Sequence, residues 1–353
     1  MILVGGEGTR LRPLTYTTPK QMLAVVEVPM IERVVGHLSA HGVTDVVLSL
    51  GYRPDAFIAG YPDGRCAGAT LTYVVEPELL DTAGAVRFAA TTADIDETFL
   101  VFNGDVLTDF DITALVALHR SSGAQGTIAL TPVEDPSAFG VVPTGADGRV
   151  EAFIEKPAPG TAPTNLVNAG IYVLDASVID RIPDGRRVNI ERETFPAMVA
   201  DRVLFAQAGD GYWLDVGTAD RYLAATADLL GGRQGAPVAG ASERSPGVWQ
   251  LGAPTIDGTV LASSLVADAA VVAEGSLVEA SVVGRGAQVE GGAVLRRSVM
   301  LAGARAGAGA QITDSIIGPG ALVGAGAVLG DLTIVGAGAS VGKGTHHVGG
   351  RLP

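Results

Sequence analysis

Residues 1–23 read MILVGGEGTRLRPLTYTTPKQML, and this stretch decides the fold class of the first part of the chain. Four apolar residues, typical of a short buried strand, run directly into a glycine-rich turn that carries Arg10 and Arg12 and is followed by Lys20. After such a strand, the backbone N–H groups of a glycine turn can point at an anion, and nearby cations complete the binding of a phosphate. The stretch therefore predicts a phosphate-binding loop in a chain whose formal net charge is -14.

Short apolar runs alternate with amphipathic stretches after this loop. Three runs predict buried strands: DVVLSL (45–50), LTYVVE (71–76) and TFLVFNGD (98–105). Residues 29–42 place Ile31, Val34, Val35 and Leu38 at helical spacing. Residues 111–123 repeat the design with Ile112, Leu115 and Val116, and each helix is followed by a glycine stop. The alternation predicts an α/β domain over residues 1–230, with a mostly parallel sheet and helices on both faces.

The composition excludes several classes of protein. Hydrophobic residues make up 47% of the chain, as expected for a globular protein. No apolar run approaches the ~20 residues of a spanning helix, and residues 1–4 lead straight into the glycine loop, so we expect neither a membrane anchor nor a signal peptide. A single cysteine, Cys66, fits a protein of the reducing cytoplasm. The acidic balance argues against nucleic acid and anionic membranes as partners.

A different texture begins after residue 230. Residues 231–255 are rich in Gly, Pro and Ser and predict a linker with irregular structure. Over residues 256–343 a branched apolar residue recurs at nearly every sixth position: Val266, Val272, Val278, Val283, Val289, Leu295 and Leu301, then Ile317, Val323, Leu329, Val335 and Val341. Such a period predicts a β-helix with three short strands per coil rather than a low-complexity Ala/Gly segment. We expect residues 344–353, with His346 and His347, to form a solvated tail.

The glycine-rich stretch carries a resemblance to a known family. GGEGTRLRPLT (5–15) with Pro-Lys at 19–20 resembles the signature of the sugar-1-phosphate nucleotidyltransferases, G-G-x-G-T-R-L-x-P-L-T followed by P-K. A generic Rossmann turn would instead carry G-x-G-x-x-G and an acidic residue about 20 positions later. Further matches follow in the family's order: VFNGD (101–105), FG (139–140), EKP (155–157), NAG (168–170) and WLDVGT (213–218).

The resemblance covers essentially the whole chain and looks closest to the actinobacterial mannose-1-phosphate guanylyltransferases. It implies a Rossmann-like nucleotidyltransferase domain followed by a left-handed β-helix of hexapeptide repeats. It also implies the reaction: an NTP and a sugar 1-phosphate give an NDP-sugar and pyrophosphate.

By the same resemblance, Arg10 serves the departing pyrophosphate, Lys20 the NTP phosphates and Lys156 the sugar phosphate, whereas Arg12 supports the loop. The implied nucleotide-binding residues are Leu3, Gly5, Gly6, Gly8, Thr9, Glu76, Asp81, Thr82, Gly84 and Asp105. The implied sugar-binding residues are Gly140, Glu155, Asn168 and Gly170. Composition adds an independent hint, because Lys20 and Lys156 are two of only three lysines, the third being Lys343.

The chemistry also explains two carboxylates. Attack of a sugar phosphate on the α-phosphate of an NTP brings two anions together, so catalysis needs positioning and neutralisation of charge. Asp105 and Asp215 can hold Mg²⁺, which prefers oxygen ligands and bridges phosphates. We therefore expect Mg²⁺ as the cofactor.

Three positions depart from the family pattern: Gln21, where most guanylyltransferases have proline, Val28, where a basic residue is usual, and Asp81, where many relatives have glycine. Asp81 can pair with guanine or cap the helix that begins near Thr82. GTP and mannose 1-phosphate are favoured. A hexose-like cyclitol phosphate, such as valienol 1-phosphate in antibiotic biosynthesis, fits the same contacts. Glucose 1-phosphate with dTTP or ATP is the alternative.

Two other classes of function compete with this hypothesis. A regulatory paralogue would bind a nucleotide-sugar without turnover, but the expected loop cations and metal carboxylates are all present. A bifunctional acyltransferase usually needs a histidine base in the β-helix, and none lies between residues 256 and 343. The flat Ala/Gly-rich faces and open ends of a short solenoid lead us to expect a homo-oligomer.

Overall fold

A computed structural model describes residues 1–233 and 237–353. Residues 234–236, which belong to the predicted linker 231–255, lie outside the described residues. The chain divides into two compact units. The first comprises Met1–Gly6 and Ile31–Asp215, and the second comprises Glu7–Met30 and Val216–Pro353.

The first unit is built on one large mixed sheet. Its centre is parallel, in the order β7-β1-β4-β6, as predicted: Phe99–Asn103, Ile2–Leu3, Asp45–Leu50 and Ala69–Val75. The long strand β12 (Leu166–Leu174) runs antiparallel to β7 and to β9 (Gly126–Pro132), and β13 (Leu204–Ala208) pairs parallel with β9. Three short strands complete the edges: β5 (Arg65–Cys66), β10 (Gly140–Val141) and β11 (Ile154–Glu155). The predicted α/β class is thus confirmed, with an antiparallel extension.

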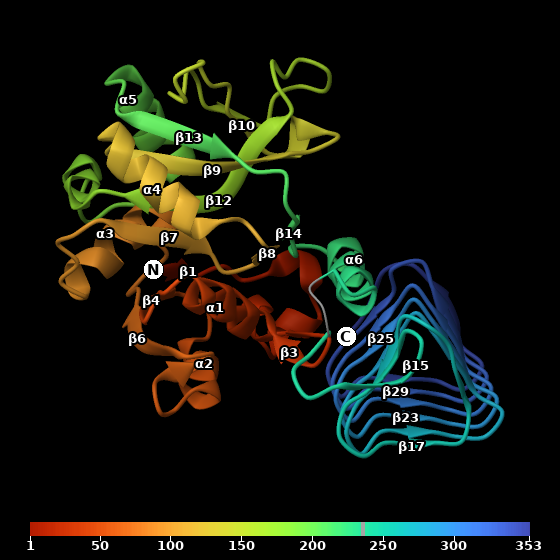
Figure 1. Ribbon diagram of the computed structural model, residues 1–353. Helices are drawn as coiled ribbons and strands as arrows, with labels where there is room; N and C mark the ends of the chain where they lie inside the picture. The colour runs from red at the N-terminus through yellow and green to blue at the C-terminus, as the bar shows by residue number, and fades with distance from the viewer. Residues whose placement is uncertain (234–236) are drawn as a thin grey trace. The chain divides into compact units, whose positions relative to one another are not determined.

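Helices cover this sheet in the way the sequence pattern predicts. In α1 (Met30–Ala40) the predicted apolar face is buried, with Ile31, Val34, Val35 and Leu38 at most 2% exposed. α4 (Ile112–Ser122) begins at Asp111, whose carboxylate accepts the N–H of Ala114 at 2.9 Å, and ends at Gly123. α4 packs on β9, β12 and β13, whereas α3 (Asp81–Thr92) packs on β1, β4 and β6. Two short helices, α2 (Pro54–Gly60) and α5 (Phe195–Ala200), complete the set (Figure 1).

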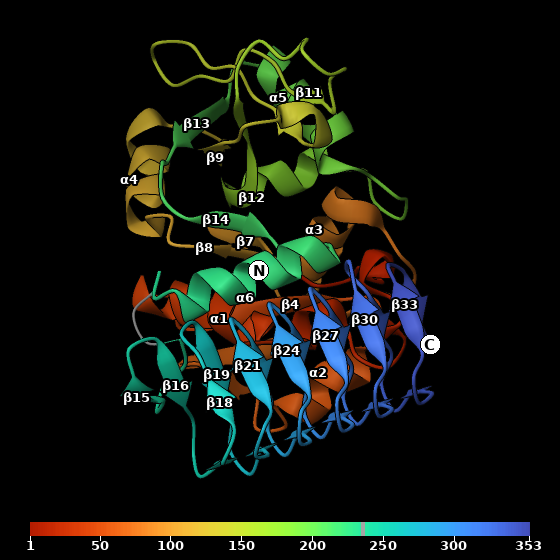
Figure 2. The same ribbon diagram turned by 90° about the vertical axis from the view of Figure 1, so that its right-hand side faces the viewer.

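In the second unit the segment Glu7–Met30 packs with the C-terminal part of the chain. The segment holds three 3-10 turns (Thr9–Leu11, Leu14–Tyr16 and Lys20–Met22) and a hairpin of β2 (Ala24–Val25) and β3 (Val28–Pro29). The hydroxyl of Tyr222 in α6 (Ala219–Leu230) donates to the carbonyl of Ala24. Both views place α6 beside the solenoid (Figures 1 and 2).

The solenoid consists of three sheets, as predicted. Figure 2 shows one of them face on, with the strands side by side in chain order: β18 (Thr259–Val260), β21 (Leu277–Glu279), β24 (Val294–Arg296), β27 (Gln311–Thr313), β30 (Val328–Gly330) and β33 (His346–Val348). The second is β17 (Thr255–Ile256), β20 (Val271–Val272), β23 (Gln288–Val289), β26 (Arg305–Ala306), β29 (Leu322–Val323) and β32 (Ser340–Val341). The third is β15 (Ser242–Ser245), β16 (Val248–Gln250), β19 (Ser264–Val266), β22 (Val282–Val283), β25 (Val299–Met300), β28 (Ile316–Ile317), β31 (Ile334–Val335) and β34 (Arg351–Leu352). The strands of the solenoid pair in parallel, except that β15 runs antiparallel to β16.

Most coils are one residue shorter than three hexapeptides, although Ile316 pairs with Ile334, 18 positions later. Equivalent residues, such as Ser264 and Ser281, lie 17 positions apart and are bonded through the N–H of Ser281 and the hydroxyl of Ser264. In most coils one corner is turned by a single residue in the left-handed region, such as Ala280 with φ 48° or Arg297 with φ 43°, followed by a buried serine, whereas one later corner uses two such residues, Asp331 and Leu332. This tight corner is one residue shorter, so Met300 joins the solenoid core there, whereas the predicted Leu301 is buried at 5% exposure but lies outside that core.

The solenoid sheets also extend beyond the predicted range 256–343. β16 lies in the predicted linker yet pairs with β19. β33 and β34 lie in the predicted tail yet continue two sheets, with His347 opposite Leu329 and Leu352 opposite Val335. The expectation of irregular structure in the linker was therefore wrong for β16, because pairing with the neighbouring coil satisfies its backbone groups. The predicted tail contains two strands, although His346 is exposed as expected. The domain boundaries stay predictions. No helix among the described residues is long and apolar enough to cross a membrane.

Candidate functional site

The carboxyl ends of the parallel strands gather several predicted residues of the first unit. Leu3 lies at the end of β1, opposite Ser49 of β4 and Asn103 of β7. A Cβ on Gly5 would lie 3.2 Å from a carboxylate oxygen of Glu76, so the loop passes close to that side chain, whereas Gly6 has open space around it. Ligands of open α/β sheets bind at this edge.

Two predicted metal carboxylates are brought together by a short ladder. Asp105 follows β7 and directly precedes β8 (Val106–Thr108). β8 pairs antiparallel with β14 (Trp213–Asp215), and Asp215 stands opposite Val106. Opposite residues in such a ladder lie about 4.5–5.5 Å apart at Cα, so Asp215 is a near neighbour of Asp105.

The donor set of this pair fits a magnesium ion, because both side chains offer carboxylate oxygens. Among the described residues there is no group of three or more His, Cys, Asp or Glu side chains placed to hold a metal. Phosphate oxygens and water would therefore complete the coordination, as is usual for Mg²⁺ in nucleotide sites.

β14 is tied to the predicted sugar segment. The indole N–H of Trp213 donates to the carbonyl of Ala169 at 2.8 Å, and the Trp213 ring meets Phe139 edge to face at 5.6 Å. Gly170 has φ 74°, and a Cβ there would lie 2.5 Å from the amide of Asn103. β14, which carries Asp215, is thus bonded directly to residues 168–170.

Asn168 acts as a hub of hydrogen bonds. Its side chain accepts the N–H of Gly170 and donates to the hydroxyl of Tyr172 and to a carboxylate oxygen of Glu191, each at 2.9 Å. Asn168 is only 8% exposed, so its side chain serves to orient the neighbouring residues that it bonds. Glu191, which the sequence analysis missed, is the side chain that this hub orients.

Three charged side chains lie around this hub. Glu155 of β11 stands opposite Gly140, and a Cβ on Gly140 would meet Phe153 at 2.7 Å and Glu155 at 3.2 Å. Lys156 Nζ lies 3.3 Å from a carboxylate oxygen of Glu155. The pKa of Glu191 is raised by burial and by the nearby Glu155, while Asn168 and Lys156 act in the opposite direction.

Four of the predicted nucleotide-binding residues, Glu76, Asp81, Thr82 and Gly84, lie in one segment, which we call the base-side segment, and they are fixed by contacts with neighbouring residues. The carboxylate of Glu76 accepts bonds from the hydroxyl of Ser49 at 3.2 Å and the N–H of Leu80 at 3.1 Å. Burial raises the pKa of Glu76 despite these bonds. Since both oxygens are engaged and the side chain is 8% exposed, we expect Glu76 to shape the loop rather than to contact the nucleotide.

Asp81 lies in the left-handed region with φ 62°. Its Oδ1 accepts the N–H of Thr82 at 2.7 Å and the amide of Asn189 at 3.1 Å, so one carboxylate oxygen serves the start of α3. Thr82 accepts the N–H of Ile190 at 2.9 Å. Gly84 is needed because a Cβ would lie 3.1 Å from the carbonyl of Arg186.

Residues 186–191 thus connect the base side to the sugar side. Asn189 and Ile190 bond Asp81 and Thr82, and Glu191 bonds Asn168. The sequence analysis missed this segment, because its polar residues carry no local spacing that marks a site. Only the tertiary fold brings it to α3 and β12.

The remaining predicted residues, Gly8, Thr9, Arg10 and Lys20, belong to the second unit. Gly8 has φ 62°, and a Cβ there would touch Lys20 and Thr15 at 3.0 Å. The hydroxyl of Thr15 donates to the carbonyl of Gly8 at 2.9 Å. Lys20 is 9% exposed, whereas Thr9 and Arg10 are exposed.

Arg12 pairs with Glu7 at 2.5 Å and lies over the ring of Tyr16 at 5.3 Å. Its guanidinium is thus engaged within the loop, and its supporting role stays a prediction.

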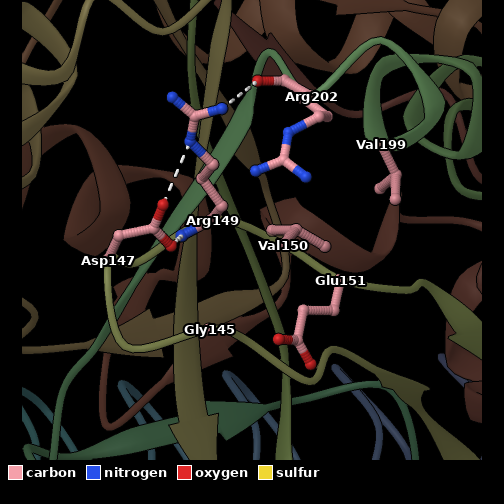
Figure 3. A pocket seen from close by; sticks show the side chains of 7 residues that line it. All are labelled: Gly145, Asp147, Arg149, Val150, Glu151, Val199 and Arg202. Carbon is pink, nitrogen blue, oxygen red and sulfur yellow. Dashed lines mark hydrogen bonds and ion pairs between the residues drawn. The ribbon is translucent and has the colours of Figure 1, made fainter.

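Two surface hollows lie in the first unit. One, of about 260 Å³, is lined by residues that include Asp147, Arg149 and Arg202 (Figure 3). The residues that line it interact with one another: Arg149 binds Asp147 at 3.2 Å and donates to the carbonyl of Arg202. It contains none of the predicted site residues. The other, of about 240 Å³, includes Leu80 and Gly84 of the base-side segment.

Replacement of Glu191 by glutamine tests its buried charge. A carboxyl whose pKa is raised by folding stabilises the fold below its unfolded pKa and loses that contribution as the pH rises through the folded pKa. We therefore expect Glu191→Gln to melt about 2 °C above the wild type at pH 7.5, and this gain should vanish below the ordinary pKa of 4.5. Thermal melts across this range measure it.

Glu193→Gln is the matched control of opposite sign. The hydrogen bond from Arg186 lowers the pKa of Glu193, so this charge favours folding above its unfolded pKa. A gain for Glu193→Gln at neutral pH, or none for Glu191→Gln, would contradict the assignment.

Comparison with known proteins gives the following matches. Residues 1–231 match the family model described as nucleotidyl transferase, and residues 260–350 match the GMPPB C-terminal domain. A mannose-1-phosphate guanylyltransferase of Mycobacterium tuberculosis is 43% identical over 66% of this chain and 64% of its own. A mannose-1-phosphate guanyltransferase of Schizosaccharomyces pombe is 43% identical over 64% of this chain and 62% of its own. The matches thus span a little less than two thirds of the length of these relatives.

Among solved structures, HddC from Yersinia pseudotuberculosis complexed with GMP-PN superposes with a TM-score of 0.55 at 27% identity. The match covers 64% of this chain and 96% of HddC.

Proposed function

The chain belongs to the nucleotidyl transferase family, and from this premise we propose that it transfers GMP from GTP to a hexose 1-phosphate, most favourably mannose 1-phosphate. The observation that carries the proposal is the bond from Trp213 to Ala169. It ties the strand of Asp215 to the segment of Asn168, so the carboxylate pair adjoins the side chains suited to a polyol ring. The names of the relatives favour guanine and mannose.

In the proposed reaction, a phosphate oxygen of the sugar 1-phosphate attacks the α-phosphorus of GTP. The bond from that phosphorus to the oxygen bridging to the β-phosphate breaks, and pyrophosphate leaves. When bound, a divalent ion, proposed to be Mg²⁺, would be held by Asp105 and Asp215 and neutralise phosphate charge.

The chain's own residues bind and orient the substrates. Lys156 attracts the sugar phosphate as a compact charge. Glu155 and Glu191 accept bonds from ring hydroxyls, and Asn168 fixes Glu191 in place. Lys20 serves the NTP phosphates and Arg10 the departing pyrophosphate.

The sugar-side groups recognise hydroxyls and do not sense whether the ring atom is oxygen or carbon. A cyclitol such as valienol 1-phosphate therefore remains a second candidate substrate beside mannose 1-phosphate. Glucose 1-phosphate with dTTP or ATP is the competing assignment.

A substrate grid tests these choices. ATP, CTP, GTP, UTP and dTTP are each combined with mannose, glucose and valienol 1-phosphates, and pyrophosphate release is measured. We expect GTP to exceed every other nucleotide by at least about tenfold in kcat/KM, which corresponds to ~1.4 kcal/mol of discrimination. A higher rate with dTTP or ATP would contradict the guanylyl assignment and leave the reaction class intact.

Asp81→Gly, measured in the same grid, tests how guanine is selected. Glycine accepts the left-handed conformation of Asp81 without strain, so the variant removes the carboxylate and keeps the backbone. If the carboxylate reads guanine, the preference for GTP over ATP should fall about tenfold.

Asp94→Gly is the control, since Asp94 is an exposed aspartate near the other end of α3 with φ 51°. It should leave the preference unchanged. An unchanged preference in Asp81→Gly would assign Asp81 to helix capping alone.

A further inference from the structure

The phosphate loop and the last coils of the solenoid are in direct contact within the second unit. The guanidinium of Arg351 donates to the carbonyl of Arg10 at 2.8 Å, although 341 positions separate the two residues. Arg351 belongs to β34 and is held in register opposite Ile334 of β31. The bond therefore joins the residue proposed to serve pyrophosphate to a fixed strand.

A second contact lies beside the first. A Cβ on Gly336 would lie 3.2 Å from the ring of Pro13 and 3.3 Å from the backbone of Pro353. Glycine at position 336 therefore lets the loop and the last strand approach closely.

A third contact lies at the far end of the segment. Val26 and Glu27 turn the β2–β3 hairpin with φ 50° and 64°, a conformation that costs energy in residues with side chains. The carboxylate of Glu27 accepts the N–H of Arg285 at 3.2 Å, and a Cβ on Gly284 would lie 3.0 Å from it. The segment is thus held on the solenoid at both ends.

The bond from Arg351 acts on a short and weakly held element. The 3-10 turn Thr9–Leu11 has two closing bonds, from Leu11 to Gly8 at 2.9 Å and from Arg12 to Thr9 at 3.3 Å. The carbonyl of Arg10 takes part in neither of these closing bonds. It accepts a hydrogen bond from Arg351 of the solenoid instead. Fixing this peptide fixes the direction in which the Arg10 side chain leaves the backbone.

We propose that Arg351 is a positioning residue for Arg10, so that the last coil of the solenoid sets the geometry of the phosphate loop. The inference rests on the proposed function for its kinetic consequence, because it uses the role of Arg10 toward pyrophosphate. Its structural consequence, the order of residues 9–12, does not depend on the reaction.

The test compares Arg351→Ala and Arg351→Lys with Arg296→Ala in the full chain. Arg296 is the matched control, since it is an exposed solenoid arginine whose guanidinium binds Glu279 of the neighbouring coil at 2.9 Å. Amide hydrogen exchange of residues 7–17, melting temperature, and the KM values for pyrophosphate and nucleotide-sugar in the reverse reaction are measured.

In Arg351→Ala we expect the amides of Leu11 and Arg12 to exchange at least about fivefold faster. KM for pyrophosphate should rise about fivefold, while KM for the nucleotide-sugar and the melting temperature stay near wild type. Arg351→Lys, which keeps a donor, should recover part of both effects, and Arg296→Ala should match the wild type.

Wild-type exchange at residues 9–12 in Arg351→Ala would overturn the proposal. So would a fall in melting temperature with all KM values changed alike, since that pattern indicates only a structural role. A wild type that lacks activity would refute the proposed function, and the exchange data would still decide whether Arg351 orders the loop.

Discussion

Asp105→Asn and Asp215→Asn should each lower turnover by about 10²-fold or more. Each change keeps the size of the side chain and removes one of two negative charges at the ladder of β8 and β14. With one charge lost, the site binds a divalent ion more weakly, and less of the phosphate charge is neutralised as the new bond forms. Turnover is measured as pyrophosphate release at several Mg²⁺ concentrations, and part of the loss should be recovered at high Mg²⁺.

The matched control is Asp147→Asn, because Asp147 is a carboxylate of the same unit that pairs with Arg149. It should keep wild-type turnover. Near wild-type rates in both Asp105→Asn and Asp215→Asn would end the metal assignment, provided that their circular dichroism spectra match that of the wild type.

Lys156→Ala and Lys20→Ala should separate kinetically. Lys156 lies beside Glu155 with a side chain 60% exposed, so its ammonium can meet an incoming sugar phosphate. We expect Lys156→Ala to raise KM for the sugar 1-phosphate at least about tenfold with little change for GTP. Lys20→Ala should instead impair the use of GTP, with a larger change in KM for GTP than for the sugar.

Lys343→Ala is the natural control, since Lys343 is the third lysine and lies exposed on the solenoid. It should leave both KM values unchanged. Equal effects of Lys20→Ala and Lys156→Ala on both substrates would show that their roles are misassigned.

The sequence predicted the helices and turns that are determined by residues close together in the chain. The apolar spacing of α1, the glycine stop of α4, and the glycine at position 8 each follow from neighbouring residues. The repeating apolar residues predicted the solenoid for the same reason. A strict six-residue period is one residue too long for most coils, because the left-handed corner at residues such as Arg297 has no marker such as glycine.

The missed features depend on contacts between distant parts of the chain. Asn189 and Glu191 became candidates only when the fold brought them to Asp81 and Asn168. Arg351 lies in a segment expected to be a tail, and nothing near it in the sequence indicates the carbonyl of Arg10 as its partner. Residues of this kind are found from tertiary structure, since the spacing that relates them is not local.

The central claim is transfer of a nucleotide to a sugar phosphate, and ³¹P NMR of one reaction tests it most directly. The purified chain is incubated with GTP, mannose 1-phosphate and Mg²⁺. We expect a phosphoanhydride (P–O–P) linkage between the α-phosphate of GTP and the sugar phosphate to appear together with an equal amount of pyrophosphate. Release of inorganic phosphate and GDP, or GTP that stays unchanged beside mannose 1-phosphate with no new linkage, would contradict it.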